Sequence, residues 1–328
     1  MDRWRRSTPD KPPFVFTLEP RCARAVFTGV WDVEAFVEQA MSLPEFSMRP
    51  APAGQRPQGL SMLETTCEGV WLLQALCGVE TLPSALMLRP YVAAAGPPAG
   101  HPGIAVLRDA GVLVDDHTVH PRIAEWIEVL GAPDVELYGG IRRGDDYLWL
   151  AVARRGELHV AASRHDDDVT IEELGQVRSL RELVVRILPL CGPPMEPVGF
   201  EPVTVPSQSL AEGLGQVVHG EHTAAAALGG LGLSAQQRRV LMRAADQPLS
   251  ALSLGVVQHD SRGCHVAKAA VTVTDTTDGR IVTGPVRSAN GSWWTQISPG
   301  TTDAVARSLR ALISTLPTPA WRDHSRLN

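Results

Sequence analysis

Residue types with metal-binding chemistry occur in two short clusters. His219-Gly-Glu-His222 places two imidazoles three residues apart, and His165-Asp-Asp-Asp168 combines one imidazole with three carboxylates. Both groups are ordinary ligands of zinc and other divalent ions. Neither cluster comes with the further ligands, or with the helical H-E-x-x-H spacing, of a catalytic metal site. Polar turns account for both clusters, and we expect no bound metal.

A glycine-rich stretch imitates a nucleotide-binding motif. Gly230-Leu-Gly-Leu-Ser-Ala235 has the G-x-G-x-x-A spacing with which a strand–turn–helix unit cradles a pyrophosphate. The segment before it is rich in alanine and predicts a helix, so the strand that would aim the glycines at a phosphate is missing. A connection between two helices is the better interpretation, and we expect no nucleotide.

Nucleophilic catalysis has a weak candidate in Cys264-His265. Neighbouring side chains of a strand point to opposite faces, which keeps this thiol and imidazole out of hydrogen-bond reach. The chain has no G-x-S-x-G and no Walker A motif. The residues therefore predict no enzyme. Two alternatives stay open: an enzyme of unknown class with a pocket between two halves of the chain, using His159, His265 or Asp166–Asp168, and a structural protein that assembles with itself.

Composition indicates a globular protein of 328 residues with a formal charge of −6. That charge argues against a general nucleic-acid binder, because no positive field is present to exchange phosphate counterions. No apolar run approaches the ~20 residues of a membrane span. Five cysteines, none in a C-x-x-C pair, indicate free thiols in a reducing compartment. We predict a cytoplasmic protein without a cofactor.

The element that organises the chain is a repeated meander. Residues 135–188 contain three short β-rich runs followed by an amphipathic helix that Pro189 ends. The connections Arg143–Asp146 and Arg155-Gly156 are too short for parallel crossovers, so the runs predict an antiparallel meander with glycine in its tight turns. The runs are 135–141, 147–154 and 157–163, and the helix carries Leu180, Leu183, Val184, Ile187 and Leu188.

The same plan recurs near the end of the chain. Strands are predicted at 252–257, 266–274, 280–283 and 293–298, followed by a helix with Val305, Leu309, Leu312, Ile313 and Leu316 that Pro317 ends. The proline-rich stretch 191–197 separates the two copies. We therefore predict an α+β fold of two related halves, 62–196 and 197–328, each with helices, a meander and a closing helix.

Other helices are predicted mainly from apolar periodicity. Ser234 is a suitable N-cap for the helix 235–245. The extension 1–61 is rich in proline, and we expect it to be poorly ordered and dispensable for folding. A short helix at 33–41 and an extended piece at 86–91 complete the prediction. The remaining helices are expected at 69–76, 102–113, 121–130, 207–217 and 223–228.

The strand 147–154 is apolar on both faces. Tyr147, Trp149 and Ala151 lie on one face, and Leu148, Leu150 and Val152 lie on the other. An antiparallel sheet usually leaves one side wet. Apolar groups on both sides indicate either helices on both faces, which we favour, or a face that receives a partner.

Several segments in order resemble the EspG proteins of mycobacterial type VII (ESX) secretion. Thr65–Leu76 is similar to the opening element of that family, and Arg154–Ala162 to its central hairpin. The resemblance runs from about Met62 to Arg326 and is distributed over many short matches. The further matching segments are Leu88–Tyr91, His101–Gly103, Asp109–Leu113, Asp275–Ile281, Ser298–Gly300 and Leu316–Trp321.

The resemblance implies a central antiparallel sheet flanked by N-terminal and C-terminal helical bundles, with quasi-two-fold related halves. It also implies a cytosolic chaperone without catalytic activity. Such a protein binds the helical tip of PPE in PE–PPE heterodimers, keeps the pair soluble and selects it for secretion. We expect the free protein to be a monomer or a weak homodimer.

In that family the tip contacts the central sheet and the C-terminal bundle. Carried onto this chain, the resemblance points to Tyr147 and Trp149 as apolar anchors, because aromatic side chains give large contact area at low entropy cost. Gln236, Arg239 and Met242 fall at i, i+3 and i+6 of one predicted helix. Arg262, in a predicted hairpin turn, is the last candidate and would meet acidic or carbonyl groups at the edge of the tip.

Overall fold

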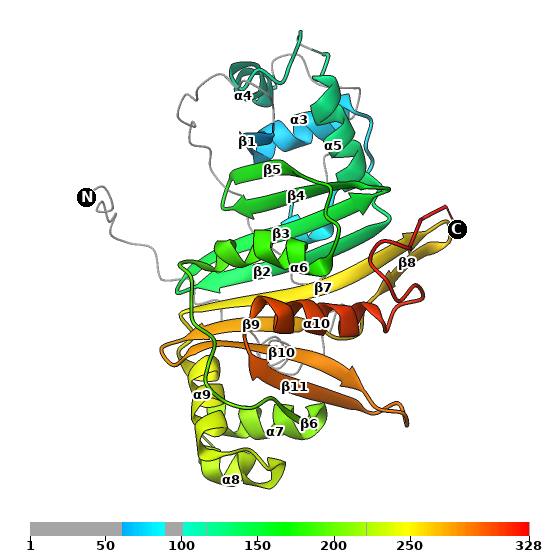
Figure 1. Ribbon diagram of the computed structural model, residues 1–328. Coiled ribbons are helices and arrows are strands. Elements are labelled where there is room, and N and C mark those ends of the chain that lie inside the picture. Colours follow the sequence, from blue (N-terminus) through cyan, green and yellow to red (C-terminus); the bar gives the residue numbers. More distant parts are fainter. Residues whose placement is uncertain (1–60, 89–100, 116, 221, 328) are drawn as a thin grey trace, which may run out of the picture.

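The computed structural model describes residues 61–88, 101–115, 117–220 and 222–327. These residues build one sheet of eleven strands with helices on both faces (Figure 1). From edge to edge the order is β1-β5-β4-β3-β2-β7-β9-β10-β11-β6, and β8 pairs only with β7. Every pairing between named strands is antiparallel. The fold is therefore α+β, as the sequence predicts.

The strands β1 to β5 form one half of the sheet, which we call the first side. It contains the predicted meander with one strand more than predicted. Its turns at Gly144 and Gly156 have φ values of 58° and 57°, which suit glycine. His165–Asp168 are predicted to end the meander, but the chain makes a tight turn there and returns as β5. Asp166 adopts the left-handed conformation that lets this hairpin close. The strands are β1 (Met62–Thr66), β2 (Val135–Arg143), β3 (Asp146–Arg155), β4 (Leu158–His165) and β5 (Asp168–Gly175).

The strands β6 to β11 form the second side, where the predicted strand 266–274 is divided between β8 and β9. Val266 pairs with Val257 of β7, and the next residue to pair with β7 is Val271, opposite Leu254. Five residue steps in this stretch therefore face only three in β7, so the stretch is not one continuous strand. Such a mismatch bulges the chain out of the ladder. The strands are β6 (Val203–Pro206), β7 (Ser250–Asp260), β8 (Gly263–Val266), β9 (Val271–Thr276), β10 (Gly279–Arg287) and β11 (Trp293–Pro299).

The two sides meet where β2 pairs with β7 along eight residues. From the outer edge to this centre, the first side has the order β1, β5, β4, β3, β2, and the second side has the order β6, β11, β10, β9, β7. On both sides the strand that comes first in the chain lies at the edge, and the meander follows from its last strand to its first. The strand order thus repeats on the two sides of the sheet. The short edge strand β6, which completes the repeat, is not recognised in the sequence.

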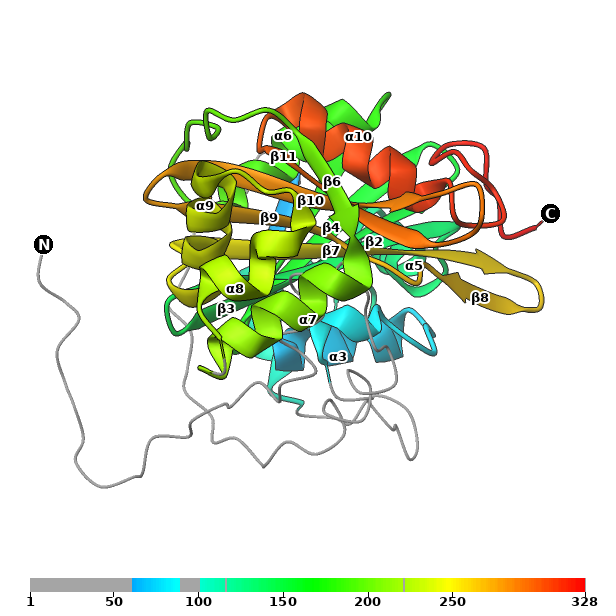
Figure 2. The same ribbon diagram turned by 90° about the horizontal axis from the view of Figure 1, so that it is seen from below.

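Helices form a layer on each face of the sheet, and Figure 2 shows both layers from below, with the sheet between them. One layer consists of α6 (Leu180–Ile187) and α10 (Thr302–Ile313), which pack on a cluster of buried residues from both sides of the sheet. The other layer has two parts. The N-terminal cover is α3 (Cys67–Leu76), α4 (Gly103–Asp109) and α5 (Pro121–Gly131), and the C-terminal cover is α7 (Ser207–Val218), α8 (Ala224–Leu228) and α9 (Ala235–Asp246).

Helix ends differ from the prediction where proline was used to place them. The helix expected to reach Leu188 ends at Ile187, and the chain continues as a 3-10 turn, Leu188–Cys191, that includes Pro189. Proline fits there because the first residues of a helical turn need no backbone donor. In the last helix, Leu316 lies beyond the end at Ile313 but is still buried.

Two further expectations meet the limits of the described residues. Leu86, predicted to be extended, lies in a 3-10 turn (Ser84–Leu86), and 89–91 fall outside the described part. The predictions for 1–60, including the helix at 33–41, also fall outside it. The described chain enters the sheet at Met62, where the sequence analysis places the start of the ordered part.

Candidate partner-binding surface

Two of the predicted anchors lie together at the start of β3. Tyr147 and Trp149 share a face with Ala151 and Ala153, which pack with the N-terminal cover. Their ring centroids are 4.2 Å apart, with planes inclined by 52°. Both side chains are half-buried. They combine packing against the sheet with some exposed aromatic surface.

Glycines in the neighbouring strands make room for these aromatic rings. A Cβ at Gly140 of β2 would overlap the hydroxyl of Tyr147, and a Cβ at Gly255 of β7 would overlap the ring of Tyr138. The tyrosine rings therefore lie across the sheet. Burial raises the pKa of Tyr138 to about 12, so this phenol stays neutral at physiological pH.

Helix α9 borders the same face on the other side of the sheet centre. Ser234 caps it in a reciprocal capping box with Gln237, as the predicted N-cap requires. Val240 and Leu241 are buried in the core of the C-terminal cover. Its outer side carries the three predicted contact residues: Gln236 and Arg239 are exposed, and Met242 is half-buried against the same core.

Two residues that sequence reasoning missed connect these elements. Leu249, in the short link from α9 to β7, is 49% exposed, which is high for a large apolar side chain in this molecule. Arg142 of β2 is exposed and pairs in register with Tyr147 on one side and Ala251 on the other. Strand alternation from Tyr138 and Gly140 would have placed Arg142 on this face. No sequence pattern would have marked Leu249 as exposed.

We call Arg142, Tyr147, Trp149 and Leu249, together with the outer side of α9, the sheet-end surface. Arg142 and Arg239 make no ion pair within the described part of the chain, whereas Arg243 of α9 pairs with Asp278 at 2.8 Å. The surface thus combines half-buried aromatic groups, an exposed leucine and two guanidinium groups. It suits an apolar partner segment with carboxylate or carbonyl groups at its edge.

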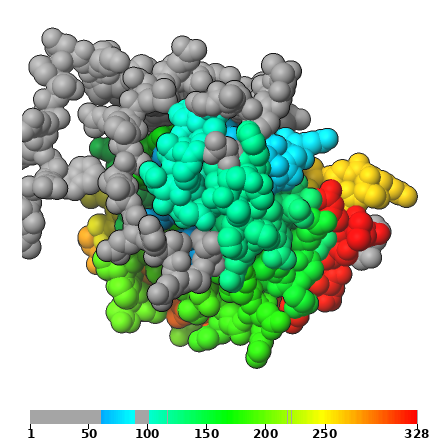
Figure 3. Space-filling view, turned by 90° about the horizontal axis from the view of Figure 1, so that it is seen from above, coloured from blue at the N-terminus to red at the C-terminus, as the bar shows by residue number. Residues whose placement is uncertain are grey.

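Arg262 lies at the opposite end of the sheet. It sits in the turn between β7 and β8, a hairpin that projects from the body beside the C-terminal segment (Figure 3). Between Ala251, next to the sheet-end surface, and Asp260, at the base of this turn, β7 extends for nine residues, or about 30 Å at the rise of a strand. The structure therefore brings five of the six predicted contact residues to one end and separates Arg262 from them.

The hairpin turn is held locally. Asp260 accepts hydrogen bonds from the backbone N–H of Arg262 at 2.7 Å and of Gly263 at 3.0 Å, and its other oxygen lies 2.8 Å from Nε2 of His265. The contact with His265 is the main reason why the pKa of Asp260 is lowered. This histidine is a partner of Asp260, and nothing links it to a catalytic arrangement with the neighbouring thiol.

The residues considered for metal or nucleotide binding lie in separate turns and helix ends. His219 is the C-cap of α7, Asp166–Asp168 form the β4–β5 turn and its exit, and Gly230–Ala235 connect α8 to α9 through a 3-10 turn. Within the described ranges, no three His, Cys, Asp or Glu residues are arranged to hold a metal ion. Burial raises the pKa of the Cys67 and Cys191 thiols to about 12 and that of Cys77 to about 11, which leaves them unreactive.

Two shallow hollows border α6 on the first side of the sheet, one against strands β3–β5 and the other against the end of β5. Neither His159, His265 nor Asp166–Asp168, the residues of the enzyme alternative, line them. Of the helices that the structure describes, none has the length and apolar character to cross a membrane.

Comparison with known proteins decides the family. Residues 66–311 match the model of the EspG family. The chain belongs to the EspG family. Its members are secretion chaperones and not enzymes, so the enzyme alternative is set aside.

Relatives of this EspG protein serve several ESX systems, to judge by their names. The ESX-1 secretion-associated protein EspG1 of Mycobacterium tuberculosis is 31% identical over 219 residues, which cover 66% of this chain and 72% of the relative. The ESX-5 secretion-associated protein EspG5 of Mycobacterium marinum is 27% identical over 294 residues, covering 79% and 95%. EspG2 of Mycobacterium tuberculosis is 30% identical and is covered completely.

The fold also matches a solved EspG structure. The type VII secretion system chaperone EspG5 of Mycobacterium tuberculosis, solved in complex with a PE25–PPE41 dimer, aligns with a TM-score of 0.71 and 24% sequence identity. The match covers 80% of this chain and all of that one. The α+β architecture with one large antiparallel sheet is thus shared between the two proteins.

Proposed function

We propose that this EspG protein is a cytoplasmic specificity chaperone that binds the helical tip of the PPE subunit in a PE–PPE heterodimer. In this role it keeps the pair soluble and selects it for type VII secretion. The observation that carries the proposal is the sheet-end surface on an EspG fold. The complex from which the solved EspG5 structure comes contains a PE–PPE dimer, which supports the same class of partner.

The chemistry of the surface suits the end of a helical hairpin. Such a tip offers apolar side chains together with backbone carbonyls that have no partner within their helix. Tyr147, Trp149 and Leu249 give the apolar contact area, and Arg142 and Arg239 are donors for carbonyl or carboxylate groups at its margin. Apolar anchors supply affinity, whereas marginal charges act mainly on specificity and association rate.

We further propose that the halves 62–196 and 197–328 are related by an approximate two-fold axis between β2 and β7. On that arrangement the N-terminal cover and the C-terminal cover stand on either side of the axis. The partner reaches the sheet between them, at the end where Tyr147 and α9 both lie. Arg262 is then a second contact, at the far end of β7, and is tested separately.

Solubility of the partner is the direct test of this function. A PE–PPE pair from the same genome is expressed alone, with the wild-type chain, and with either of two matched variants. Leu249→Asp changes the exposed leucine of the sheet-end surface, and Val114→Asp changes an equally apolar residue, 70% exposed, on the first side of the molecule.

Wild type and Val114→Asp are expected to recover the pair in the soluble fraction, and Leu249→Asp is expected to recover much less. Because both residues are exposed, neither change should alter thermal stability. The proposal fails if no pair gains solubility with the wild-type chain. Equal rescue by both variants would leave the chaperone and remove this surface from its interface.

A further inference from the structure

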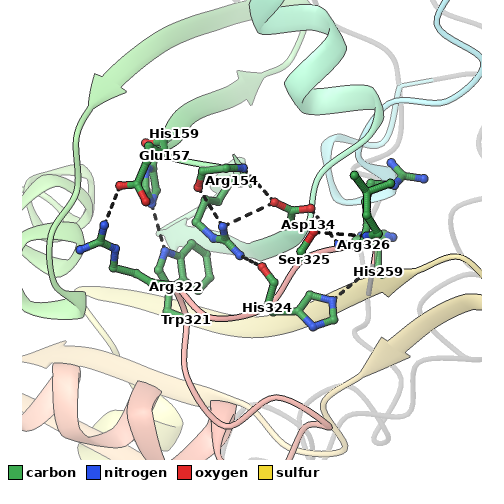
Figure 4. A network of polar contacts seen from close by, with 12 residues as sticks. Asp134, Arg154, Glu157, His159, His259, Trp321, Arg322, His324, Ser325 and Arg326 are labelled. Carbon is green, nitrogen blue, oxygen red and sulfur yellow. Dashed lines mark hydrogen bonds and ion pairs between the residues drawn. The ribbon is translucent and has the colours of Figure 1, made fainter.

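The C-terminal segment, residues 314–327, crosses the molecule at the end of the sheet that carries the β7–β8 hairpin (Figure 1). It follows α10 and contacts strands from both sides of the sheet. On the second side it meets Gln258 of β7. Figure 4 shows its contacts with His259 of the same strand and, on the first side, with Asp134, Arg154 and His159. It therefore joins the two halves through contacts that are independent of the β2–β7 ladder.

Contacts to β7 fix the first part of the segment. Gln258 is fully buried and pairs reciprocally with Thr318, donating to its carbonyl at 2.6 Å and accepting from its N–H at 3.1 Å. His324 bridges back to the same strand, with Nε2 2.7 Å from the carbonyl of His259 and Nδ1 3.0 Å from the hydroxyl of Thr318. These bonds hold the segment against the base of the hairpin.

A buried ion pair holds the last part. Arg154 is 2% exposed and Asp134 is 5% exposed, and the guanidinium donates both to Asp134, at 3.5 Å, and to the backbone carbonyl of His324. The other oxygen of Asp134 accepts from the N–H of Arg326 at 2.9 Å. Both charges are thus satisfied in part by the backbone of the C-terminal segment, so the ion pair and the segment hold each other in place.

The contact between Trp321 and His159 fixes the protonation state of an imidazole. His159 is 1% exposed, and its Nδ1 lies 3.0 Å from the carbonyl of Glu157, which can only accept a hydrogen bond. Nδ1 therefore carries the proton. Nε2 receives a hydrogen bond at 3.1 Å from the indole N–H of Trp321, which can only donate. The contact therefore exists only while the ring is neutral.

The surroundings of His159 act mainly against its protonation. Burial is the largest cause that lowers its pKa, and Arg154 and Arg322 act in the same direction, while the hydrogen bond to the Glu157 carbonyl and the Glu157 carboxylate oppose it. On the other side, β5 presents only Gly175 at this register. The stability due to the neutral ring is therefore fully present above about pH 6.5, the ordinary value for histidine, and is lost as the pH falls below it.

The neighbouring histidines face acceptors instead. Both ring nitrogens of His324 lie beside groups that can accept a hydrogen bond, the hydroxyl of Thr318 and the carbonyl of His259. His259 lies 3.8 Å from the carboxylate of Glu136. Of the three histidines that the structure places around the C-terminal segment, His159 is the one whose protonation breaks a contact within it.

We propose that residues 314–327 form a latch across the two halves of the sheet, and that protonation of His159 opens it. A second N–H at Nε2 faces the indole N–H of Trp321, and the two donors repel each other. The indole then leaves a site where it is 5% exposed, and the segment detaches from β4. The inference concerns the fold itself and does not depend on the partner.

The test follows the indole N–H of Trp321 by proton–nitrogen NMR of the full-length chain. The signal is assigned through Trp321→Phe, and the pH is lowered from 7.5 to 5. Because burial lowers the pKa of His159, we expect the wild-type signal to leave its neutral-pH position only at a pH below the ordinary histidine value of about 6.5. In His159→Gln the amide oxygen still accepts from the indole but does not titrate, so the signal should stay in place over the same range.

A second readout uses the thermal midpoint. Between pH 7.5 and 5.5 the midpoint of wild type should fall more steeply than that of His159→Gln. His265→Gln, at a half-exposed histidine of the hairpin, should fall as wild type does. If His159→Gln does not fold, the wild-type titration still decides. A Trp321 signal that stays at its neutral-pH position down to pH 5, or equal pH slopes for wild type and His159→Gln, would overturn the proposal.

Discussion

The two helical covers on one face of the sheet differ in how they are held. Eight large apolar side chains of the helices and 3-10 turn of the N-terminal cover are fully buried, including Trp126, whereas α7, α8 and α9 together bury three leucines to this extent, Leu210, Leu228 and Leu241. The C-terminal cover has a smaller apolar core and is tied down by polar contacts, such as Gln237 to the carbonyl of Glu201 and Arg243 to Asp278. The N-terminal cover therefore mainly adds to the hydrophobic core, whereas the C-terminal cover holds α9 with one side exposed.

This difference separates stability from recognition. A helix that is buried on one side by a few residues and polar on the other can present side chains to a partner without being essential to the core. We therefore expect substitutions in the N-terminal cover to act on folding, and substitutions on the outer side of α9 to act on binding. The following changes test that division, beginning with the largest expected effect.

Trp126→Ala should be the most destabilising. The indole is fully buried in α5, and its N–H donates to Glu173 at 3.1 Å, a carboxylate that also accepts from Arg122. Removing a buried tryptophan costs about 3–5 kcal/mol of unfolding free energy. Chemical denaturation measures the change, and the folded fraction should still bind its partner with wild-type affinity. A cost below about 1 kcal/mol would contradict the assignment of this cover to the core.

Leu241→Ala should cost less and act on both properties. The side chain is 1% exposed beneath α9, in a cluster of fewer large residues, and we expect a loss of about 2–3 kcal/mol, at the lower end for a buried leucine. A looser α9 should also weaken partner binding. The comparison would be wrong if this variant lost stability as Trp126→Ala does and bound its partner unchanged.

Charge reversals at the two ends of the sheet form a matched pair. Arg239→Glu and Arg262→Glu both change an exposed arginine, so both should leave the unfolding free energy within about 0.5 kcal/mol of wild type. Arg239→Glu should weaken partner affinity by about tenfold, mostly through slower association at low salt. Arg262→Glu is predicted to weaken it as well, if the partner spans β7.

Surface-immobilised binding kinetics distinguish the outcomes. An effect of Arg239→Glu alone would confine the partner to the sheet-end surface. An effect of Arg262→Glu alone would move the interface to the hairpin and contradict the role of α9.

Local patterns predicted most of the fold. The meander turns at Gly144 and Gly156, the capped helix after Ser234 and the apolar stripe of the last helix all follow from neighbours in sequence. The missed strand β5 begins in an acidic turn, and the adjacent Glu172 and Glu173 interrupt its short alternation of apolar and polar residues. In the fold β5 is paired on both sides, with β4 through the tight turn and with β1, which precedes it by about a hundred residues.

The candidate site was harder to predict for the same physical reason. That Tyr147 and α9 share one end of the sheet depends on the β2–β7 pairing between the halves, and no local pattern encodes that register. The same pairing places Arg262 about 30 Å away along β7. His159 was considered only for catalysis, because its partner Trp321 lies 162 residues later in the chain.

The central claim, that the chain binds a PE–PPE heterodimer through the PPE tip, is tested most directly by mixing purified components. Size-exclusion chromatography with light scattering should give one ternary species, with one copy of each chain, for at least one PE–PPE pair of the same genome. The same pair with its PPE tip truncated should elute separately from the chain. Separate elution of every intact pair, or an equally stable complex with the truncated tip, would contradict the claim.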